Sequence, residues 1–170
     1  MGGLGLQRLL ETRTALLLLP LASLSALAAA FISQYVFELQ PCALCIYQRW
    51  PFAIAAAICL IALYPGLRVA APWILLLAAS VLLVNAGIAA YHVGVEQHWW
   101  AGSEACVGTG GTPKTLAELR AQIMATPVIR CDEVAWSLFG VSMAGYNVLF
   151  SLALAIYAGL AGRPAIGGRN

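Results

Sequence analysis

The sequence has few charged residues. Asp, Glu, Lys and Arg together make up 9% of the 170 residues, whereas soluble globular domains carry about 25%. Hydrophobic residues reach 62%, so the chain is predicted to be a membrane protein. The formal net charge is only +2, which argues against a nucleic-acid partner. The sequence also carries no motif for binding haem, flavin or a nucleotide.

The apolar residues gather in runs long enough to cross a membrane. A helix rises about 1.5 Å per residue, so about 20 residues span a hydrocarbon core of about 30 Å. The run at residues 50–64 reaches that length only if its helix begins near Cys45. Cys45 and Arg49 then lie at the membrane boundary, where an arginine can extend its charge into water. Asn85 lies inside a run and should face protein rather than lipid.

These runs predict an all-α membrane protein, a bundle of four transmembrane helices in a single domain that covers residues 1–170. The predicted spans are residues 15–37, 45–64, 69–91 and 136–160. A cleaved signal peptide is the alternative for the first run, because Ala26-Leu27-Ala28 resembles a small-residue cleavage site. The length of that run and the spans that follow it favour a membrane helix.

The basic residues predict the orientation of the bundle. Four spans place both termini and the turn after the second span on one side of the membrane. That side has a single acid, Glu11, and its basic residues are Arg8, Arg13, Arg68, Arg163 and Arg169. By the positive-inside rule it is cytoplasmic. The loops at residues 38–44 and 92–135 then face the periplasm of a bacterial inner membrane, where disulfides persist.

The second periplasmic loop is predicted to contain a short amphipathic helix. Thr115 and Glu118 match a capping box, and Pro113 suits a first helical turn. Apolar residues then follow at helical spacing, at positions Leu116, Leu119, Ile123 and Met124. A helix lying on the membrane surface is the preferred interpretation, and a helix packed on the other loops is the alternative.

Cys42 and Cys45 form a Cys-x-x-Cys motif where the second span begins. A helix N-terminus stabilises a thiolate, and Arg49, one turn after Cys45, adds a positive charge on the same face. Cys45 is therefore predicted to be the more stabilised thiolate, with Cys42 as its disulfide partner. A redox-active dithiol is the preferred interpretation. A static disulfide and half of a zinc site are the alternatives, and zinc would need four converging ligands.

A second pair, Cys106 and Cys131, lies in the long loop. Taken alone, this pair would be read as a structural disulfide that stabilises the loop. Beside a dithiol at the membrane boundary, exchange of a disulfide between the two pairs explains it better. The sequence leaves the pairing of the four cysteines open. The fifth, Cys59, is mid-span and is predicted to be a small core residue.

A dithiol at the hydrocarbon boundary can meet a lipid-soluble oxidant, and a quinone is the predicted class. Arg49 would favour the negative charge that develops on a quinone or a thiolate. His92 and Glu96 lie one turn apart at the end of the third span. Either could bind a polar group near Arg49, although ordinary interfacial residues would also fit these positions.

These features together resemble the DsbB family of disulfide bond formation proteins. The resemblance covers nearly the whole chain: four spans, a separated cysteine pair in the second outer loop, and Cys131-Asp132-Glu133 before a tryptophan and the last span. Its most specific part is the motif Cys42-Ala43-Leu44-Cys45-Ile46-Tyr47-Gln48-Arg49. Gln48 departs from the family pattern, because an acid is expected there.

The resemblance implies a thiol:quinone oxidoreductase. The Cys106–Cys131 pair would accept electrons from a periplasmic thioredoxin-like partner, DsbA, with Cys106 as the site of attack. The Cys42–Cys45 pair would then be reduced by exchange, and Cys45 would pass the electrons to ubiquinone or another membrane quinone. Arg49 and His92 would bind the quinone, and no metal ion is implied.

Two other functions fit parts of the pattern. A vitamin K epoxide reductase-like protein also pairs loop cysteines with a quinone site, but an extra span or a fused thioredoxin domain would favour it, and neither is seen. A non-catalytic membrane protein with structural disulfides or a zinc site in its outer loops is the alternative from a different class.

Overall fold

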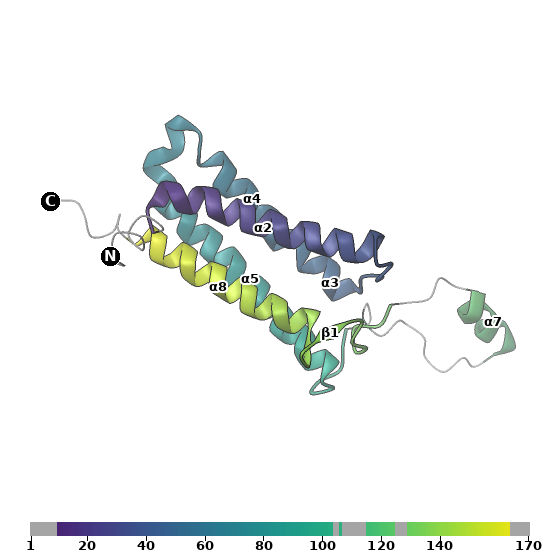
Figure 1. Cartoon of the computed structure of the whole chain (residues 1–170). Helices are drawn as coiled ribbons and strands as arrows, with labels where there is room; N and C mark the ends of the chain where they lie inside the picture. The colour runs from purple at the N-terminus through teal and green to yellow at the C-terminus, as the bar shows by residue number, and fades with distance from the viewer. Residues whose placement is uncertain (1–9, 104–105, 107–114, 125–128, 164–170) are drawn as a thin grey trace.

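The computed structural model of the chain describes residues 10–103, 106, 115–124 and 129–163. Long helices run side by side through the described part (Figure 1). They are α2 (Thr12–Tyr35), α3 (Ala43–Tyr47) followed directly by α4 (Arg49–Ile61), α5 (Ala71–Glu96) and α8 (Met143–Gly162). Four segments, with α3 and α4 counted as one, are long and apolar enough to cross a membrane. The predicted four-helix membrane bundle is confirmed.

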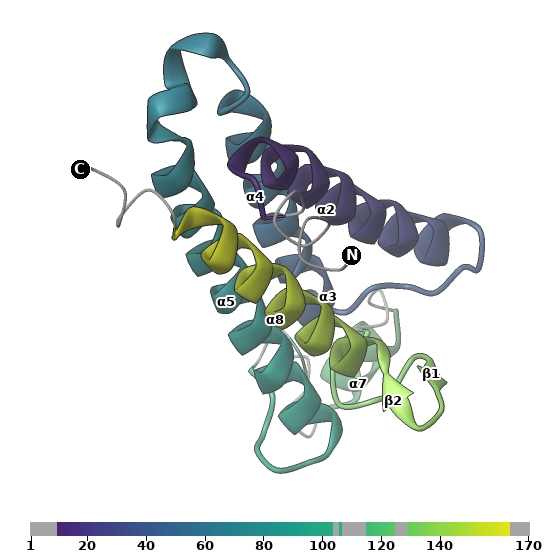
Figure 2. The ribbon, with the colours of Figure 1, turned by 60° about the vertical axis from the view of Figure 1, so that its left-hand side comes forward.

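The helices pack in pairs. Helix α5 packs most extensively against α8, α2 packs against α4, and α4 joins the two pairs through α5 (Figures 1 and 2). Small residues let the helices approach closely in the shared core, which contains Ala15, Ala55, Ala78, Ala158 and Ala161. Cys59 is fully buried there, as predicted. The outward faces carry large apolar side chains that suit a lipid surrounding, among them Leu17, Leu77, Leu149 and Ile156.

Both ends of the bundle can be followed in Figure 1. Helix α2 begins and α8 ends at one end, where the 3₁₀ helix η1 (Pro65–Ala70) also joins α4 to α5. Helix α3 lies at the opposite end. Asn85 is buried in α5 and its Nδ2 donates to Ser151 Oγ of α8 at 2.9 Å. Asn85 therefore faces protein, as predicted.

The last helix begins later than predicted. Residues 136–142, assigned to the fourth span from the sequence, instead form a hairpin in which β1 (Ser137–Leu138) pairs antiparallel with β2 (Val141–Ser142). Phe139 and Gly140 form its turn at φ of 51° and 78°, the backbone conformation that a tight hairpin turn requires. Ser142 then caps α8 by accepting a hydrogen bond from the backbone N–H of Gly145 at 3.2 Å.

The predicted loop helix is present as α7 (Leu116–Met124). Its capping box is formed as expected: Thr115 Oγ1 accepts from the backbone N–H of Glu118 at 3.1 Å, and the Glu118 carboxylate accepts from the backbone N–H of Thr115 at 3.2 Å. Pro113 lies outside the described residues. Figure 1 shows α7 standing apart from the four long helices.

Candidate functional site

The first cysteine pair lies at the start of α3. Cys42 is the N-cap residue of this helix, and its Sγ accepts a hydrogen bond from the backbone N–H of Cys45 at 3.3 Å. A Cys-x-x-Cys motif at a helix start brings both side chains into one turn. The two sulfurs consequently lie 2.9 Å apart as free thiols. This spacing puts them within easy reach of a disulfide bond.

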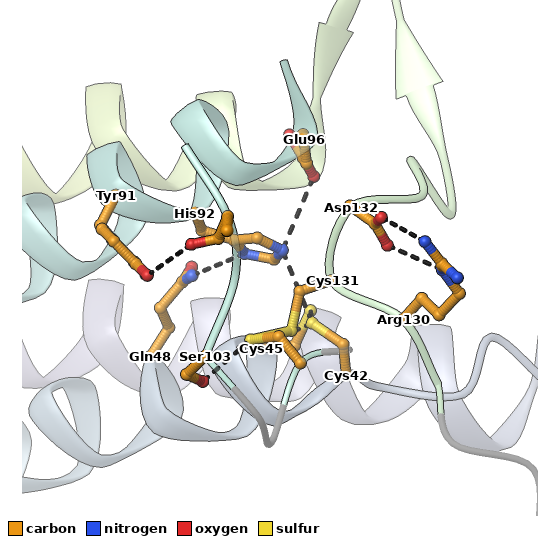
Figure 3. The surroundings of a disulfide bond; sticks show 12 residues. Cys42, Cys45, Gln48, Tyr91, His92, Glu96, Ser103, Arg130, Cys131 and Asp132 are labelled. Atoms are coloured by element: carbon orange, nitrogen blue, oxygen red, sulfur yellow. Dashed lines mark hydrogen bonds and ion pairs between the residues drawn. A yellow bond between two sulfur atoms is a disulfide. The ribbon is translucent and has the colours of Figure 1, made fainter. Parts of the chain in front are cut away.

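His92 reaches this pair from α5. Its ring is buried, and Nε2 lies 3.5 Å from Cys42 Sγ while Nδ1 lies 2.9 Å from the side-chain nitrogen of Gln48 (Figure 3). Helix α5 continues to Glu96, so His92 and Glu96 share one helical face. Glu96 Oε1 lies 3.8 Å from His92 Nε2, and Ser142 donates to the other oxygen of this buried carboxylate. The predicted residue His92 is thus in direct contact with a sulfur.

The stabilised thiolate belongs to Cys42. The hydrogen bond from the Cys45 thiol lowers the pKa of Cys42 from 9.0 to about 4, against the effect of burial and with further help from His92. The sequence had favoured Cys45 for this role. That expectation was wrong because the N-cap position belongs to Cys42, and because His92, 50 residues away, adds a hydrogen bond that spacing along one helix does not predict.

This assignment predicts the pH dependence of Cys42 alkylation. In protein whose first pair is reduced, Cys42 should react with iodoacetamide at a rate nearly constant between about pH 6 and pH 8, because a group whose pKa is about 4 is ionised throughout that range. Peptide mass spectrometry would locate the label. In the Cys45→Ala variant the donor thiol is lost, so the pKa of Cys42 should rise and the rate should increase with pH. A wild-type rate that climbs tenfold per pH unit would contradict the assignment.

The second pair forms a disulfide beside the first. Cys106 and Cys131 are bonded, with 4.9 Å between their Cα atoms, and both are buried. Cys42, Cys106 and Cys131 belong to one apolar cluster with Leu44 and Val95. Figure 3 shows the sulfur-bearing side chains gathered on one side of His92. A reduced dithiol therefore lies next to a disulfide, which is the arrangement that thiol–disulfide exchange requires.

The segment that leads to Cys106 is packed onto α5. Trp100 stacks on Tyr91, with 5.8 Å between the ring centroids, and its Nε1 donates to the Tyr91 carbonyl oxygen at 3.1 Å. The indole covers Gly94 so closely that a Cβ there would lie 1.9 Å from the ring. Only a residue without a side chain permits this approach. Trp100 thus fixes the start of the loop near the first cysteine pair.

A cavity of about 410 Å³ opens beside the first pair. Both sulfurs of that pair, His92 and Glu96 border it, and its walls come from α2, α4 and α8, with Ala26, Ala29, Ala30, Phe52 and Phe150 among the lining residues. Small-molecule pockets have volumes of about 300–1,000 Å³ and are mostly apolar. A flat, lipid-soluble ring with polar oxygens fits this size and lining.

Arg49 borders the same cavity. Helix α2 holds its guanidinium: Nη1 donates to Gln34 Oε1 at 2.7 Å, and the group lies 4.9 Å from the centre of the Phe31 ring. The predicted residue Arg49 is therefore fixed at the wall of the pocket that the sulfurs face. From there it can donate to an oxygen of a bound ring.

The zinc alternative can be tested against the ligand atoms. Within the described residues, one group could hold a metal ion: the ligand atoms of Cys42, Cys45 and His92 all lie within 4.8 Å of one another. A closed structural zinc site takes four ligands. Cys106 and Cys131, which the sequence offered as the other ligands, are bonded to each other. With that bond formed, Cys106 and Cys131 cannot serve as two of the four ligands.

Sequence reasoning assigned no role to Gln48. Its side chain is buried, and it bonds His92 on one side and accepts a hydrogen bond from Asn147 of α8 on the other. The sequence did hold one indication that Gln48 lies near the cysteine pair: it follows Cys45 by three residues, which puts both on one helical face. Asn147 carried no such signal, because its contact with Gln48 joins positions 99 residues apart.

A dithiol packed against a disulfide inside a membrane bundle defines a membrane thiol–disulfide oxidoreductase. The family model for Disulfide bond formation protein DsbB matches residues 12–161. The chain therefore belongs to the DsbB family, which confirms the resemblance noted from the motifs. Membership makes it a multi-pass membrane oxidoreductase of disulfide bond formation.

Named relatives agree with this. Disulfide bond formation protein B of Xanthomonas euvesicatoria pv. vesicatoria is 31% identical over 153 residues, which cover 85% of this chain and 87% of the relative. The protein of that name from Herminiimonas arsenicoxydans is 39% identical over 88 residues, or 52% of this chain and 55% of the relative. An uncharacterized protein of Rickettsia prowazekii is 31% identical over 140 residues, or 81% and 80%. No solved structure matches the chain.

Proposed function

We propose that the protein oxidises a DsbA-like periplasmic dithiol and passes the electrons to ubiquinone or another membrane quinone. The observation that carries this proposal is the position of the first cysteine pair between two partners. On one side it packs in the same cluster as the Cys106–Cys131 disulfide, and on the other it borders an apolar cavity between the helices. A relay from a soluble thiol to a lipid-soluble oxidant needs both contacts.

The outer disulfide would react with the soluble partner. A thiolate of the partner attacks Cys106, and the bond to Cys131 breaks as a mixed disulfide forms. The partner's second thiolate then attacks the mixed disulfide. The partner leaves with its own disulfide formed, and Cys106 and Cys131 are left reduced. Exchange with an oxidised Cys42–Cys45 pair restores the outer disulfide and leaves the inner pair as thiols. The structure has this pairing, with the inner pair reduced and the outer pair bonded.

The inner pair would then be re-oxidised by the quinone. Forming the Cys42–Cys45 disulfide removes two electrons and two protons from the thiols, and a quinone substrate takes up the same number when it becomes a quinol. Cys45, Arg49 and His92 border the cavity in which it would bind. The Arg49 guanidinium would donate to a ring oxygen, and the aromatic rings of Phe52 and Phe150 would pack on its faces.

The proposed location is a bacterial inner membrane, with the termini in the cytoplasm and the cysteine pairs in the periplasm. Helix α2 begins and α8 ends at the end of the bundle opposite to α3, which carries Cys45 (Figure 1). Arg13 and Arg163 lie at the terminal end, in agreement with the positive-inside rule. The periplasm would permit the disulfides to persist.

The direct test uses purified protein, a reduced DsbA-like partner and a soluble ubiquinone analogue. Quinone absorbance should fall over many turnovers, and one disulfide should form in the partner for each quinone reduced. A protein with static disulfides would show no turnover, and a zinc protein would carry metal at about one ion per chain. Either result would replace the proposed function with the non-catalytic alternative.

Arg49→Ala is expected to raise KM for the quinone analogue about tenfold, because a hydrogen bond from a charged donor contributes about 1.5–3 kcal/mol. Exchange between the two cysteine pairs should be unaffected, since Arg49 contacts Gln34 and Phe31 rather than a sulfur. Arg163→Ala, at the far end of the bundle, is the matched control. Unchanged quinone kinetics in Arg49→Ala would remove Arg49 from the proposed site.

A further inference from the structure

A chain of polar side chains crosses the bundle from α5 through α8 to the first cysteine pair. Asn85 Nδ2 donates to Ser151 Oγ, and the Ser151 hydroxyl donates to Asn147 Oδ1, each at 2.9 Å. Asn147 Nδ2 donates to Gln48 Oε1. Gln48 Nε2 then meets His92 Nδ1 at 2.9 Å. The chain therefore ends on the ring that touches Cys42.

The direction of this chain fixes the protonation of the ring. A side-chain amide has one donor end and one acceptor end, so the use of one end determines what the other can do. The acceptor end of Gln48 is occupied by Asn147, and its amino group, which can only donate, faces Nδ1 of His92. Nδ1 must accept, so the proton of the neutral imidazole lies on Nε2.

We propose that Gln48 is a positioning residue that fixes the tautomer of His92 and so directs an N–H donor at the sulfur of Cys42. Nε2 lies 3.5 Å from Cys42 Sγ, which is hydrogen-bond distance for sulfur, and 3.8 Å from Glu96 Oε1. A donor aimed at a sulfur stabilises the thiolate over the thiol. The amide chain would in this way keep Cys42 ready to react.

Other groups around the ring are consistent with this direction. The Glu96 carboxylate is the second possible acceptor for Nε2–H, and Ser142, the N-cap of α8, donates to it. From α3 the ring faces Cys42 and Cys45. The cavity that His92 borders is lined by three further charged residues: Arg49 of α4, and Arg130 and Glu133 of the segment that follows α7.

The consequence for the reaction rests on the proposed function. In thiol–disulfide exchange, a sulfur that is stabilised as a thiolate is the better leaving group. When a thiolate of the reduced outer pair attacks Cys45 of the oxidised inner pair, a bond forms between those two sulfurs, the Cys42–Cys45 bond breaks, and Cys42 leaves as a thiolate. The second outer thiolate then attacks the mixed disulfide, which restores the Cys106–Cys131 bond and releases Cys45, so no outside oxidant is needed. The tautomer of His92 would set how well Cys42 is stabilised as it leaves.

The tautomer can be measured directly. The chain has two histidines, so labelling the full-length protein with ¹⁵N-histidine gives two ring spectra, and His98→Gln assigns them. At about pH 8, where an ordinary imidazole is neutral, His92 should show its proton on Nε2. In Gln48→Glu the new carboxylate can only accept, so Nδ1 should become protonated. The matched control is Gln97→Glu. Gln97 is an exposed residue at the C-terminal end of α5, the helix that carries His92, and its substitution should leave the tautomer of His92 unchanged.

A second measurement links the tautomer to the sulfur. In Gln48→Leu, the midpoint of Cys42 alkylation against pH should rise by about one pH unit, as expected for a weakened hydrogen bond to a charged group. Gln97→Leu should leave the midpoint in place. A wild-type His92 that carries its proton on Nδ1, or an unmoved midpoint in Gln48→Leu, would overturn the proposal. Neither measurement uses a quinone or a partner, so failure of the proposed function would be seen separately in the turnover assay.

Discussion

Cys42→Ser and Cys45→Ser should each reduce steady-state quinone reduction by about a thousandfold or more, the loss expected when a nucleophile that forms a covalent intermediate is removed. A serine oxygen can neither form the disulfide nor ionise near neutral pH, so two electrons can no longer leave the inner pair together. The two sulfurs lie 2.9 Å apart in one turn at the start of α3, and no third cysteine lies in that turn to replace either of them. The measurement is quinone absorbance in the presence of excess reduced partner.

These variants should retain one half of the reaction. Neither substitution touches the Cys106–Cys131 disulfide, so each protein molecule should still oxidise about one equivalent of reduced partner and then stop. Cys59→Ser is the matched control, because Cys59 is a free cysteine buried in the core of the bundle, and it should turn over normally. Repeated turnover in Cys42→Ser or Cys45→Ser would show that electrons reach the quinone by another route.

The fold could be predicted where the length of an apolar run decides it. Long apolar runs require helices that cross the membrane, and α2, α5 and the joined α3 and α4 agree with the predicted spans to within a few residues. The start of α8 could not be predicted in this way, because Leu138, Phe139 and Val141 are as apolar as a span. Their hairpin depends on positive φ values at Phe139 and Gly140. The glycine was the one local indication of such a turn in the sequence, because glycine adopts positive φ at little cost.

The site could be predicted where its residues share one helix. The Cys-x-x-Cys motif and Arg49 are close in sequence, and the structure places all three at one cavity. Contacts between helices were not predictable from spacing. His92 was expected near Arg49 from its position at the end of the third span and from the resemblance, but its contact with Cys42 was not expected. That contact helps to reverse which sulfur is the stabilised thiolate. The role proposed for Gln48 depends on its contacts with His92 on α5 and Asn147 on α8.

The two pairs differ in their surroundings in a way that suits their proposed order of reaction. The inner pair is held by α3 at the end of a packed bundle and borders the cavity. The outer pair lies in a loop that contacts α5 through Trp100. Under the proposed function, separate disulfides would let the outer pair react with a soluble partner at the loop while the inner pair reacts with a quinone in the membrane pocket.

That separation leads to the second large effect. Cys106→Ser and Cys131→Ser should lower the oxidation of a reduced DsbA-like partner by about a thousandfold or more, because the partner's thiolate then has no disulfide to attack in the loop. Cys42 is itself buried and packs in one cluster with the outer disulfide, so the inner pair offers the partner no exposed disulfide in its place. The measurement is the formation of partner disulfide, followed by trapping of free thiols.

The inner pair should remain active in the same variants. A small dithiol such as dithiothreitol can reach the cavity that Cys42 and Cys45 border, so quinone reduction driven by dithiothreitol should persist while reduction driven by the partner is lost. In Cys42→Ser, quinone reduction should instead be lost with either reductant, while about one equivalent of partner is still oxidised by the outer disulfide. If Cys106→Ser and Cys131→Ser oxidised the partner at the wild-type rate, the outer disulfide would be a structural bond, and the relay would reduce to a single dithiol that reacts with both substrates in turn.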